Sequence, residues 1–416
     1  MGEGSWEIDD SLDELELLAD TAGALVTDRV VQSLTKINPA TYVGKGKVQE
    51  IKGLVKMRDA DLVIFDDDLV PVQLRNLERE FGCKLVDRSG LILDIFASRA
   101  KTATAKTQVE LAQLDYLRTR LTRAWTHLSR QKGGIGTKGP GETQIETDRR
   151  MIGHRISVLT DRLKKIDQQR KTQRKGRSQY TRVSLVGYTN AGKSTLMNAL
   201  ADTTLLAEDR LFATLDSTTR VAALGPGKEI LLSDTVGFIR KLPHKLIESF
   251  KSTLDEVRES DALVHVVDVT HPGFQDQIRT VNLTLKELGA LEKPTLMVFN
   301  KIDRLDEKEI IRPLQSEYRH SAFVSGLRGI GLTELKAGLV EMIESDFVER
   351  TLYIPAEDSK TVARIHQVAE VIDEEYVIVD SSTDGEQKAV VRLRFRVSPM
   401  QQSALKSDLD KYADSA

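Results

Sequence analysis

The sequence predicts a multidomain α/β protein: two α/β domains separated by a helical hairpin and followed by a small α+β domain. Short apolar runs alternate with amphipathic helical patterns in residues 21–98 and again in residues 181–346. This alternation is typical of parallel sheets covered by helices. The chain has 416 residues, and a single hydrophobic core stops growing at about 250–300 residues. Several cores are therefore expected.

Residues 1–20 form an acidic N-terminal extension with eight acidic and no basic residues. We expect a short amphipathic helix or a frayed end there, and we assign it no function. The N-terminal α/β domain follows over residues 21–98, with helical patterns at residues 48–57 and 71–81. Three strands are predicted, at Ala24-Leu25-Val26, Leu62-Val63-Ile64-Phe65 and Lys84-Leu85-Val86.

Two short motifs in this domain are weak. Tyr42-Val43-Gly44-Lys45-Gly46-Lys47 is similar to half of a phosphate-binding loop, yet it lacks the full spacing of such loops, and a glycine turn with solvated lysines is favoured. If functional, it would hold an RNA phosphate or a second nucleotide. Asp66-Asp67-Asp68 could bind a metal, but an acidic loop that caps the helix beginning at Pro71 is favoured.

Residues 99–180 are predicted to form a basic antiparallel helical hairpin. Two stripes of apolar residues recur at alternating steps of three and four, which is the heptad pattern. The stripes are Leu114, Leu117, Leu121, Ala124 and Leu128, and then Ile152, Ile156, Leu159, Leu163 and Ile166. Between them, residues 133–141 contain five glycines and a proline, which neither helix can cross. This segment would be the tip of the hairpin.

The hairpin carries a strong positive charge. Residues 99–182 contain 21 Lys and Arg against 7 Asp and Glu, a net charge of +14, whereas the whole chain has a net charge of −3. Such an asymmetry favours a polyanionic partner, and nucleic acid is the leading candidate. The tip is longer than a helix connection needs, so we expect it to contact that partner. Residues 168–182, with six basic residues, are predicted to be a linker or a frayed helix end.

The chemistry centres on a P-loop that follows a strand pattern and precedes a helix. Its residues are Gly187, Tyr188, Thr189, Asn190, Ala191, Gly192, Lys193, Ser194 and Thr195. The glycines let consecutive N–H groups face a phosphate, at the positive end of a helix. Lys193 is expected to reach the β and γ phosphates, and the Ser194 hydroxyl to bind Mg²⁺.

Two further segments are expected to sense the third phosphate. Asp234-Thr235-Val236-Gly237 ends a predicted strand, so Asp234 would support Mg²⁺ and the Gly237 N–H would face the γ phosphate. A threonine on the segment that begins Phe212-Ala213-Thr214 would complete the metal site. Thr214 is preferred, and Thr218 and Thr219 stay open. With Lys193, Asp234 and Gly237 are the predicted catalytic residues.

Asn300-Lys301-Ile302-Asp303 predicts a guanine pocket at the end of another strand. The Asp303 carboxylate can accept hydrogen bonds from guanine N1–H and the exocyclic amine, a donor pair that adenine lacks. Ser325-Gly326-Leu327 is expected to form the last loop at the base. The predicted ligands are therefore GTP or GDP with Mg²⁺, in a GTPase domain over residues 181–346.

The residue after Gly237 is Phe238, where Ras-like enzymes place a carboxamide that orients the attacking water. Phe238 cannot orient water, so we expect slow intrinsic hydrolysis that a bound surface accelerates. Arg220 could stabilise charge internally, but a solvated side chain is favoured.

Residues 347–416 are predicted to form a C-terminal α+β domain. Strands are expected at Leu352-Tyr353-Ile354 and at residues 376–379 and 389–397, and helices at residues 360–372 and from Pro399 onward.

The single cysteine, Cys83, excludes an internal disulfide. No run approaches about 18 apolar residues, and the acidic N-terminus is unlike a signal peptide. We therefore expect a cytoplasmic, monomeric protein without a membrane span; peripheral attachment to a membrane stays open.

The chain resembles the HflX GTPases from about residue 21 to residue 345. The segments that carry the resemblance are residues 42–47, 65–69, 75–78, 94–100, 125–131 and 134–150, together with the stretch Phe212-Ala213-Thr214-Leu215-Asp216-Ser217-Thr218-Thr219-Arg220. The resemblance implies a GTPase that binds the large ribosomal subunit and its rRNA and splits stalled or idle ribosomes under stress, with the hairpin tip near the peptidyl transferase centre. The alternatives are a GTPase of large-subunit assembly, a P-loop ATPase or kinase, or an RNA-binding protein that uses nucleotide only structurally.

Overall fold

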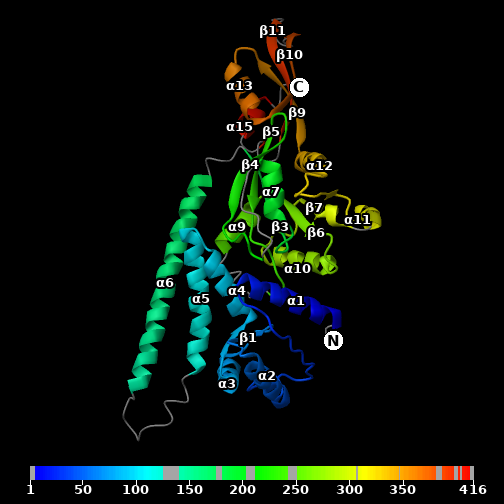
Figure 1. Ribbon diagram of the computed structural model, residues 1–416. Coiled ribbons are helices and arrows are strands. Elements are labelled where there is room, and N and C mark those ends of the chain that lie inside the picture. Colours follow the sequence, from blue (N-terminus) through cyan, green and yellow to red (C-terminus); the bar gives the residue numbers. More distant parts are fainter. Residues whose placement is uncertain are drawn as a thin grey trace.

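The computed structural model describes residues 5–124, 140–174, 180–202, 211–241, 251–305, 308–345, 347–380, 387–397, 402 and 405–412. Four parts follow one another along the chain (Figure 1): an N-terminal α/β part, two long helices, a central domain with a six-stranded sheet, and a C-terminal α+β domain. The predicted fold class is therefore confirmed.

The N-terminal part contains a two-stranded parallel sheet covered by helices. Its elements are α1 (Ser5–Thr21), α2 (Lys45–Arg58), β1 (Leu62–Phe65), α3 (Pro71–Phe81), β2 (Lys84–Asp87) and α4 (Arg88–Arg99). α3 begins at Pro71 because proline suits the first helical turn, and it ends before Gly82, whose φ of 72° suits a left-handed C-cap. Residues 5–21 form a regular helix, the first of the two structures expected there.

Two predictions for this part are wrong. Ala24-Leu25-Val26 is not a strand, and the Leu25 side chain is 90% exposed. A run of three apolar residues does not specify a strand when no neighbouring strand pairs with it. The carboxylates of residues 66–68 do not cap α3, whose N-cap residue is Val70. They contact Arg88, Ser89 and Lys241 instead.

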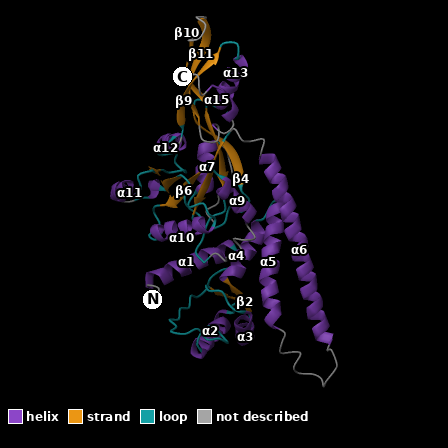
Figure 2. Cartoon of the chain, turned by 180° about the vertical axis from the view of Figure 1, so that it is seen from behind, coloured by secondary structure: helices purple, strands orange, loops and turns teal. Residues whose placement is uncertain are grey.

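The hairpin helices are α5 (Ala103–Ala124) and α6 (Pro140–Arg174), which pack side by side (Figure 2). Leu159 is buried on the predicted stripe of α6, but Leu117 of α5 is 46% exposed. α5 turns Ala105, Val109 and Ala112 into the main core instead. Residues 133–139 of the predicted tip and Leu128 lie outside the described residues.

The hairpin boundaries also differ from the prediction. α6 begins at Pro140, so residues 140–141 belong to the helix and not to the tip. At its other end α6 runs on to Arg174, so residues 168–174 are helical, in agreement with the helix end that was one of the two structures predicted there. With 35 residues, α6 is about 50 Å long.

The central domain is a six-stranded sheet in the order β4-β5-β3-β6-β7-β8, in which only the β4–β5 pair is antiparallel. Its strands are β3 (Thr181–Gly187), β4 (Thr218–Gly225), β5 (Lys228–Asp234), β6 (Ala262–Asp268), β7 (Thr295–Asn300) and β8 (Ser321–Phe323). Its helices are α7 (Lys193–Ala201), α9 (Lys251–Glu259), α10 (Phe274–Glu287), η2 (Ile302–Arg304), η3 (Lys308–Ile310), α11 (Ile311–Glu317) and α12 (Leu332–Glu344).

Helices cover both faces of this sheet, and strand residues alternate between the two cores. Leu185 of β3 packs with α7 and α12 in one cluster, whereas Val186 packs with α9 and α10 in the other. The second cluster continues without interruption into α1, α4 and α5 through Leu18, Ile95, Phe96 and Val109. The N-terminal part and the base of the hairpin therefore share one core with the central domain.

The C-terminal domain is a three-stranded antiparallel sheet in the order β10-β11-β9, formed by β9 (Val348–Pro355), β10 (Glu370–Asp380) and β11 (Gln387–Val397) and packed with α13 (Ser359–Val368) and α15 (Lys406–Tyr412). The helix predicted to extend to residue 372 ends at Val368, because β10 pairs with β11 from Glu370 onward. The strands predicted here are present but longer than expected.

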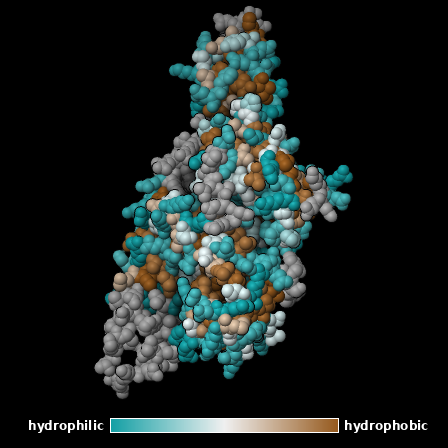
Figure 3. Space-filling view, viewed as in Figure 1, coloured by the Kyte–Doolittle hydropathy of each residue, from teal (hydrophilic) through white to brown (hydrophobic). Residues whose placement is uncertain are grey.

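Within the described ranges, no helix is both long enough and apolar enough to cross a membrane. On the face of the molecule shown in Figure 3, hydrophobic residues are interspersed with hydrophilic ones.

Candidate functional site

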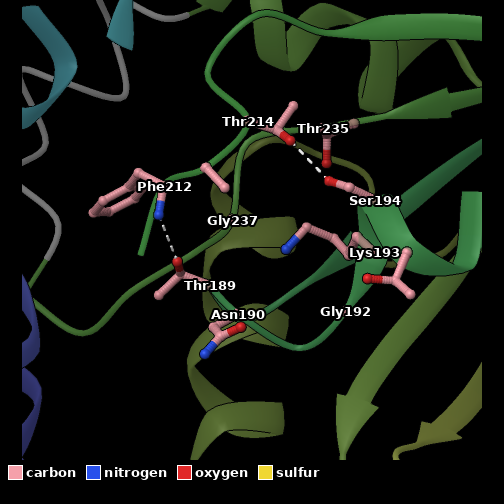
Figure 4. Close-up of a pocket in the computed structure, with 11 residues that line it drawn as sticks. Thr189, Asn190, Gly192, Lys193, Ser194, Phe212, Thr214, Thr235 and Gly237 are labelled. Carbon is pink, nitrogen blue, oxygen red and sulfur yellow. Dashed lines mark hydrogen bonds between the residues drawn. The ribbon is translucent and has the colours of Figure 1, made fainter. Parts of the chain in front are cut away.

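The predicted P-loop connects β3 to α7, at the edge of the sheet where the parallel strands end. Gly187 has a φ of 151°, and a Cβ atom there would collide with the carbonyl oxygen of Val266 on β6. The loop lines a pocket that Figure 4 shows in close-up. The residues that line it are Thr189, Asn190, Gly192, Lys193, Ser194, Thr195, Phe212, Ala213, Thr214, Thr235 and Gly237.

Lys193 lies at the first turn of α7, and its side chain is buried. Its Nζ donates hydrogen bonds to the carbonyl oxygens of Gly187 (3.1 Å) and Tyr188 (2.8 Å). Burial lowers the pKa of this ammonium to about 8, and the nearby Asp234 carboxylate opposes that shift. An ammonium group that is desolvated in this way binds a phosphate strongly.

Three oxygen-bearing side chains meet beside Lys193. The Ser194 Oγ lies 2.8 Å from the Thr214 Oγ1 and donates a hydrogen bond of 2.6 Å to the Asp234 Oδ2. Figure 4 shows the Ser194 and Thr214 hydroxyls facing each other. Burial raises the pKa of Asp234, against the opposing effects of Lys193, Ser194 and Thr214.

These groups fit a magnesium ion. Among the described residues, the buried Oδ1 of Asp234 has no hydrogen-bond partner. The Ser194, Thr214 and Asp234 side chains offer hard oxygen ligands, which Mg²⁺ prefers. The two hydroxyl oxygens are separated by 2.8 Å, and neighbouring ligands in a magnesium octahedron are separated by about 3 Å. Thr218 and Thr219, the competing threonines, lie in β4, where Thr219 Oγ1 is 3.0 Å from Ser233 Oγ.

The segment after β5 lies directly against the P-loop. A Cβ atom on Gly237 would come within 2.6 Å of the Thr189 Cα, so only glycine allows this approach. Phe238 continues the contact, because its N–H donates to the Gly187 carbonyl (3.1 Å) and its carbonyl accepts from the Thr189 N–H (2.7 Å). The Phe238 ring is buried in the main core, so the side chain is absent from the phosphate pocket.

The loops predicted to bind the base lie beside the P-loop and outside the pocket lining. Asn300 connects them: its Nδ2 donates to the Ala191 carbonyl (2.9 Å), and its Oδ1 accepts from the Gly326 N–H (3.0 Å). Lys301 pairs with Asp268 at 2.7 Å. Asp303 lies exposed in η2, and Leu327 is 68% exposed. Gly187, Tyr188, Ala191, Asp234 and Val236 also lie outside the lining.

Several contacts that support the site were not predicted. Asp268 was assigned no role, yet it holds Lys301. Tyr188, predicted only as a P-loop residue, donates its hydroxyl to Glu14 of α1 and accepts from the Arg240 N–H at 2.8 Å. Their partners are 33 to 174 residues away in the sequence, so no local pattern could have indicated these contacts.

Arg220 is exposed on β4 and bonds to the Thr219 carbonyl, as a solvated residue would.

The chain is similar to known protein families and to solved structures. Three family models match the chain: "GTP-binding GTPase N-terminal" over residues 9–97, "GTP-binding GTPase Middle Region" over residues 99–177, and "50S ribosome-binding GTPase" over residues 182–301. A solved structure of a GTP-binding protein from Sulfolobus solfataricus in complex with GDP is 26% identical, with a TM-score of 0.43, and the match covers 80% of this chain and 95% of that one.

Relatives of known name cover most of the chain. The protein "GTPase HflX" of Flavobacterium psychrophilum is 55% identical over 70% of both chains. The relative of the same name from Lacrimispora saccharolytica is 48% identical over 88% of this chain and 86% of its own, and that from Escherichia coli is 44% identical over 90% and 88%. The chain is therefore a GTP hydrolase that belongs to the HflX family of GTPases.

Proposed function

We propose that this GTPase associates with the large ribosomal subunit through its basic hairpin, that the bound nucleotide controls this association, and that it splits stalled or idle ribosomes under stress. The family model over the central domain is described as a 50S ribosome-binding GTPase. Family membership and the net charge of +14 on residues 99–182 support an RNA-rich partner.

The observation that carries this proposal is the joint between the nucleotide domain and the hairpin. Ala105, Val109 and Ala112 of α5 lie in the same hydrophobic cluster as Phe212 and Phe238, which flank the phosphate pocket. Because close-packed cores transmit displacement, a change at the pocket can move the base of a helix pair whose longer member, α6, is about 50 Å long.

Sedimentation with purified large subunits tests the association. We expect the full chain to pellet with the subunits when a non-hydrolysable GTP analogue is bound and to stay in the supernatant with GDP. Replacing residues 133–141 by a short Gly-Ser connection should abolish pelleting without changing affinity for the nucleotide. Equal pelleting in the two nucleotide states would contradict the proposal.

Gradient analysis of intact ribosomes tests the splitting activity. With the GTP analogue, the chain should convert intact ribosomes into separate subunits, and the variant that lacks residues 133–141 should not. Binding to incomplete large subunits without any splitting would instead support a role in subunit assembly.

We also propose how the site hydrolyses GTP. Mg²⁺ held by Ser194 and Thr214, with Asp234 behind them, would neutralise phosphate charge, and Lys193 would hold the β and γ phosphates. Phe238 is buried and orients no water, so hydrolysis would be slow until a ribosomal surface orders the residues around Thr214 and Gly237. Single-turnover GTP hydrolysis should accelerate when large subunits are added; equal rates would argue against this.

A further inference from the structure

Asp216 connects the nucleotide-sensing loop to the first helix of the hairpin. Its Oδ2 accepts hydrogen bonds from the backbone N–H groups of Lys101 and Thr102, both at 3.1 Å, and its Oδ1 accepts from the Thr102 hydroxyl. The partners are separated by 114 and 115 residues. This carboxylate therefore lies on the nucleotide-sensing loop and bonds to the residues that begin α5.

The contact is part of the N-terminal cap of α5. The Thr102 Oγ1 accepts a hydrogen bond from the Ala105 N–H at 3.1 Å, and the Thr102 carbonyl accepts from the Lys106 N–H at 3.0 Å. Asp216 accepts from the amides of Lys101 and Thr102, just before the helix. It also adds a negative charge at the positive end of this 22-residue helix. Loss of Asp216 would leave the amides of Lys101 and Thr102, which precede the first turn of α5, without this acceptor.

The other side of the same loop is bound to the phosphate pocket. The Phe212 N–H donates to the Thr189 Oγ1 at 3.0 Å, and the Thr214 hydroxyl lies 2.8 Å from that of Ser194. Figure 4 shows both contacts. Residues 212–216 thus span from the P-loop to α5.

The loop is held in one defined conformation. Phe212 has a φ of 54°, which is uncommon for a bulky residue. Its ring packs edge-on against Phe96 of α4, with 4.7 Å between ring centroids, and both rings are buried. A strained backbone that persists because its surroundings fix it is a common feature of switch segments.

We propose that Asp216 is a positioning residue: it holds Thr214 at the metal and third-phosphate site, and through the same hydrogen bonds it reports the position of the loop to α5. When the third phosphate is bound, Thr214 stays beside Ser194 and the Asp216 contact caps α5. When the phosphate is lost, the loop leaves Ser194 and the α5 cap opens. The significance of this coupling for ribosomes rests on the function proposed above; the coupling itself does not.

Hydrogen exchange of the full chain tests the coupling. In the wild type, the amides of residues 101–106 should exchange about fivefold more slowly with a GTP analogue and Mg²⁺ than with GDP, a size typical of one capping interaction. Asp216→Ala should remove this difference, and Asp216→Asn should weaken it. Ser217→Ala is the matched control, because the neighbouring Ser217 hydroxyl bonds to Glu256 of α9 and not to α5; it should keep the wild-type difference.

A second pair of variants changes Thr102, the partner of Asp216 at the start of α5. Thr102→Val should weaken the nucleotide-dependent difference, because it removes the hydroxyl contact and leaves the two amide contacts to Asp216, and Thr102→Ser should keep the wild-type difference. Exchange at the β6 amides should be the same in all variants, which separates the effect from general loss of stability. Single-turnover hydrolysis should be slower in Asp216→Ala at saturating GTP, with a smaller change in GTP affinity.

Two outcomes would overturn the proposal. One is a wild-type chain in which exchange at residues 101–106 is independent of the nucleotide. The other is Asp216→Ala retaining the wild-type difference. If instead the wild type shows the difference but does not pellet with large subunits, the coupling stands and the ribosomal function fails.

Discussion

Lys193 illustrates how burial tunes a single residue for phosphate. It lies near Asp234 and near His265 of β6. Burial lowers the pKa of His265 to about 3, so this imidazole stays neutral at physiological pH. Lys193 thus loses its charge near pH 8 in the absence of phosphate, although its position in the P-loop gives the usual expectation of a permanent cation.

The affinity for GTP should depend on pH because of this shift. The phosphates favour the charged ammonium, so binding requires Lys193 to be protonated, and above its pKa of about 8 the site must take up a proton to bind. The dissociation constant should rise about fourfold between about pH 7 and pH 8.5. Fluorescent-nucleotide titration measures it. Lys193→Arg, whose charge does not titrate in this range, should give a flat profile; an equally flat wild-type profile would contradict the shift.

Asp303 decides the identity of the base in our interpretation. It is exposed in η2, next to the loops that Asn300 connects. Asp303→Asn should lower GTP affinity and raise that for xanthosine triphosphate, because an amide donates to the oxygen that replaces the exocyclic amine of guanine. Competition binding with both nucleotides checks this; an unchanged preference for GTP would place base recognition elsewhere.

At the scale of elements, Asp87 joins β2, α4 and α5. It is 1% exposed and caps α4 by accepting from the Gly90 N–H at 2.9 Å. It also accepts from the Tyr116 hydroxyl at 2.6 Å and pairs with Arg120, whose guanidinium stacks 3.8 Å from the Tyr116 ring centroid. This buried carboxylate therefore adds polar contacts to the apolar packing that orients the hairpin relative to the N-terminal part.

Asp87→Ala should reduce the free energy of unfolding by about 3 kcal/mol or more, because it removes the buried carboxylate that pairs with Arg120 and accepts from Tyr116, and it removes a helix cap. Urea unfolding followed by circular dichroism measures this. Asp94→Ala is the control, since Asp94 is exposed on α4, and it should change the value by less than about 0.5 kcal/mol. A similar effect for both variants would show that Asp87 is not a structural hub.

At the scale of the whole molecule, α1 links the N-terminal part to the nucleotide domain. Glu14 contacts both the buried Arg88 guanidinium and the Tyr188 hydroxyl of the P-loop. Burial lowers the pKa of Arg88 to about 10. Asp10 of the same helix pairs with Arg240 at 2.8 Å, just after the segment 234–237 that is predicted to face the third phosphate.

Glu14→Ala should lower the free energy of unfolding by about 3 kcal/mol, because the Arg88 charge loses one of its two carboxylate partners in a buried site. Glu16→Ala removes a carboxylate from the same helix, but its pair with Arg29 is solvent-exposed, so the loss should stay below about 1 kcal/mol. Chemical denaturation compares the two. Equal losses would mean that α1 acts only through its apolar face.

The sequence by itself determined the nucleotide chemistry of this protein. Thr189, Lys193 and Ser194 belong to one short segment, where glycines and a strand-to-helix turn set the backbone locally. The heptad spacing likewise predicted two long helices from neighbouring residues alone. Such features follow from chain connectivity within a few turns of helix or one strand, so they can be predicted without knowledge of the tertiary fold.

Only the tertiary structure decided what the nucleotide site is connected to. Asp216, Asp87 and Glu14 act on partners 29 to 174 residues away, and their neighbours in the sequence carry no sign of this. The failed strand at residues 24–26 and the exposed Leu117 have the same origin. Which apolar faces pack together decides burial and long-range pairing, and that choice depends on the whole chain, not on any one segment of it.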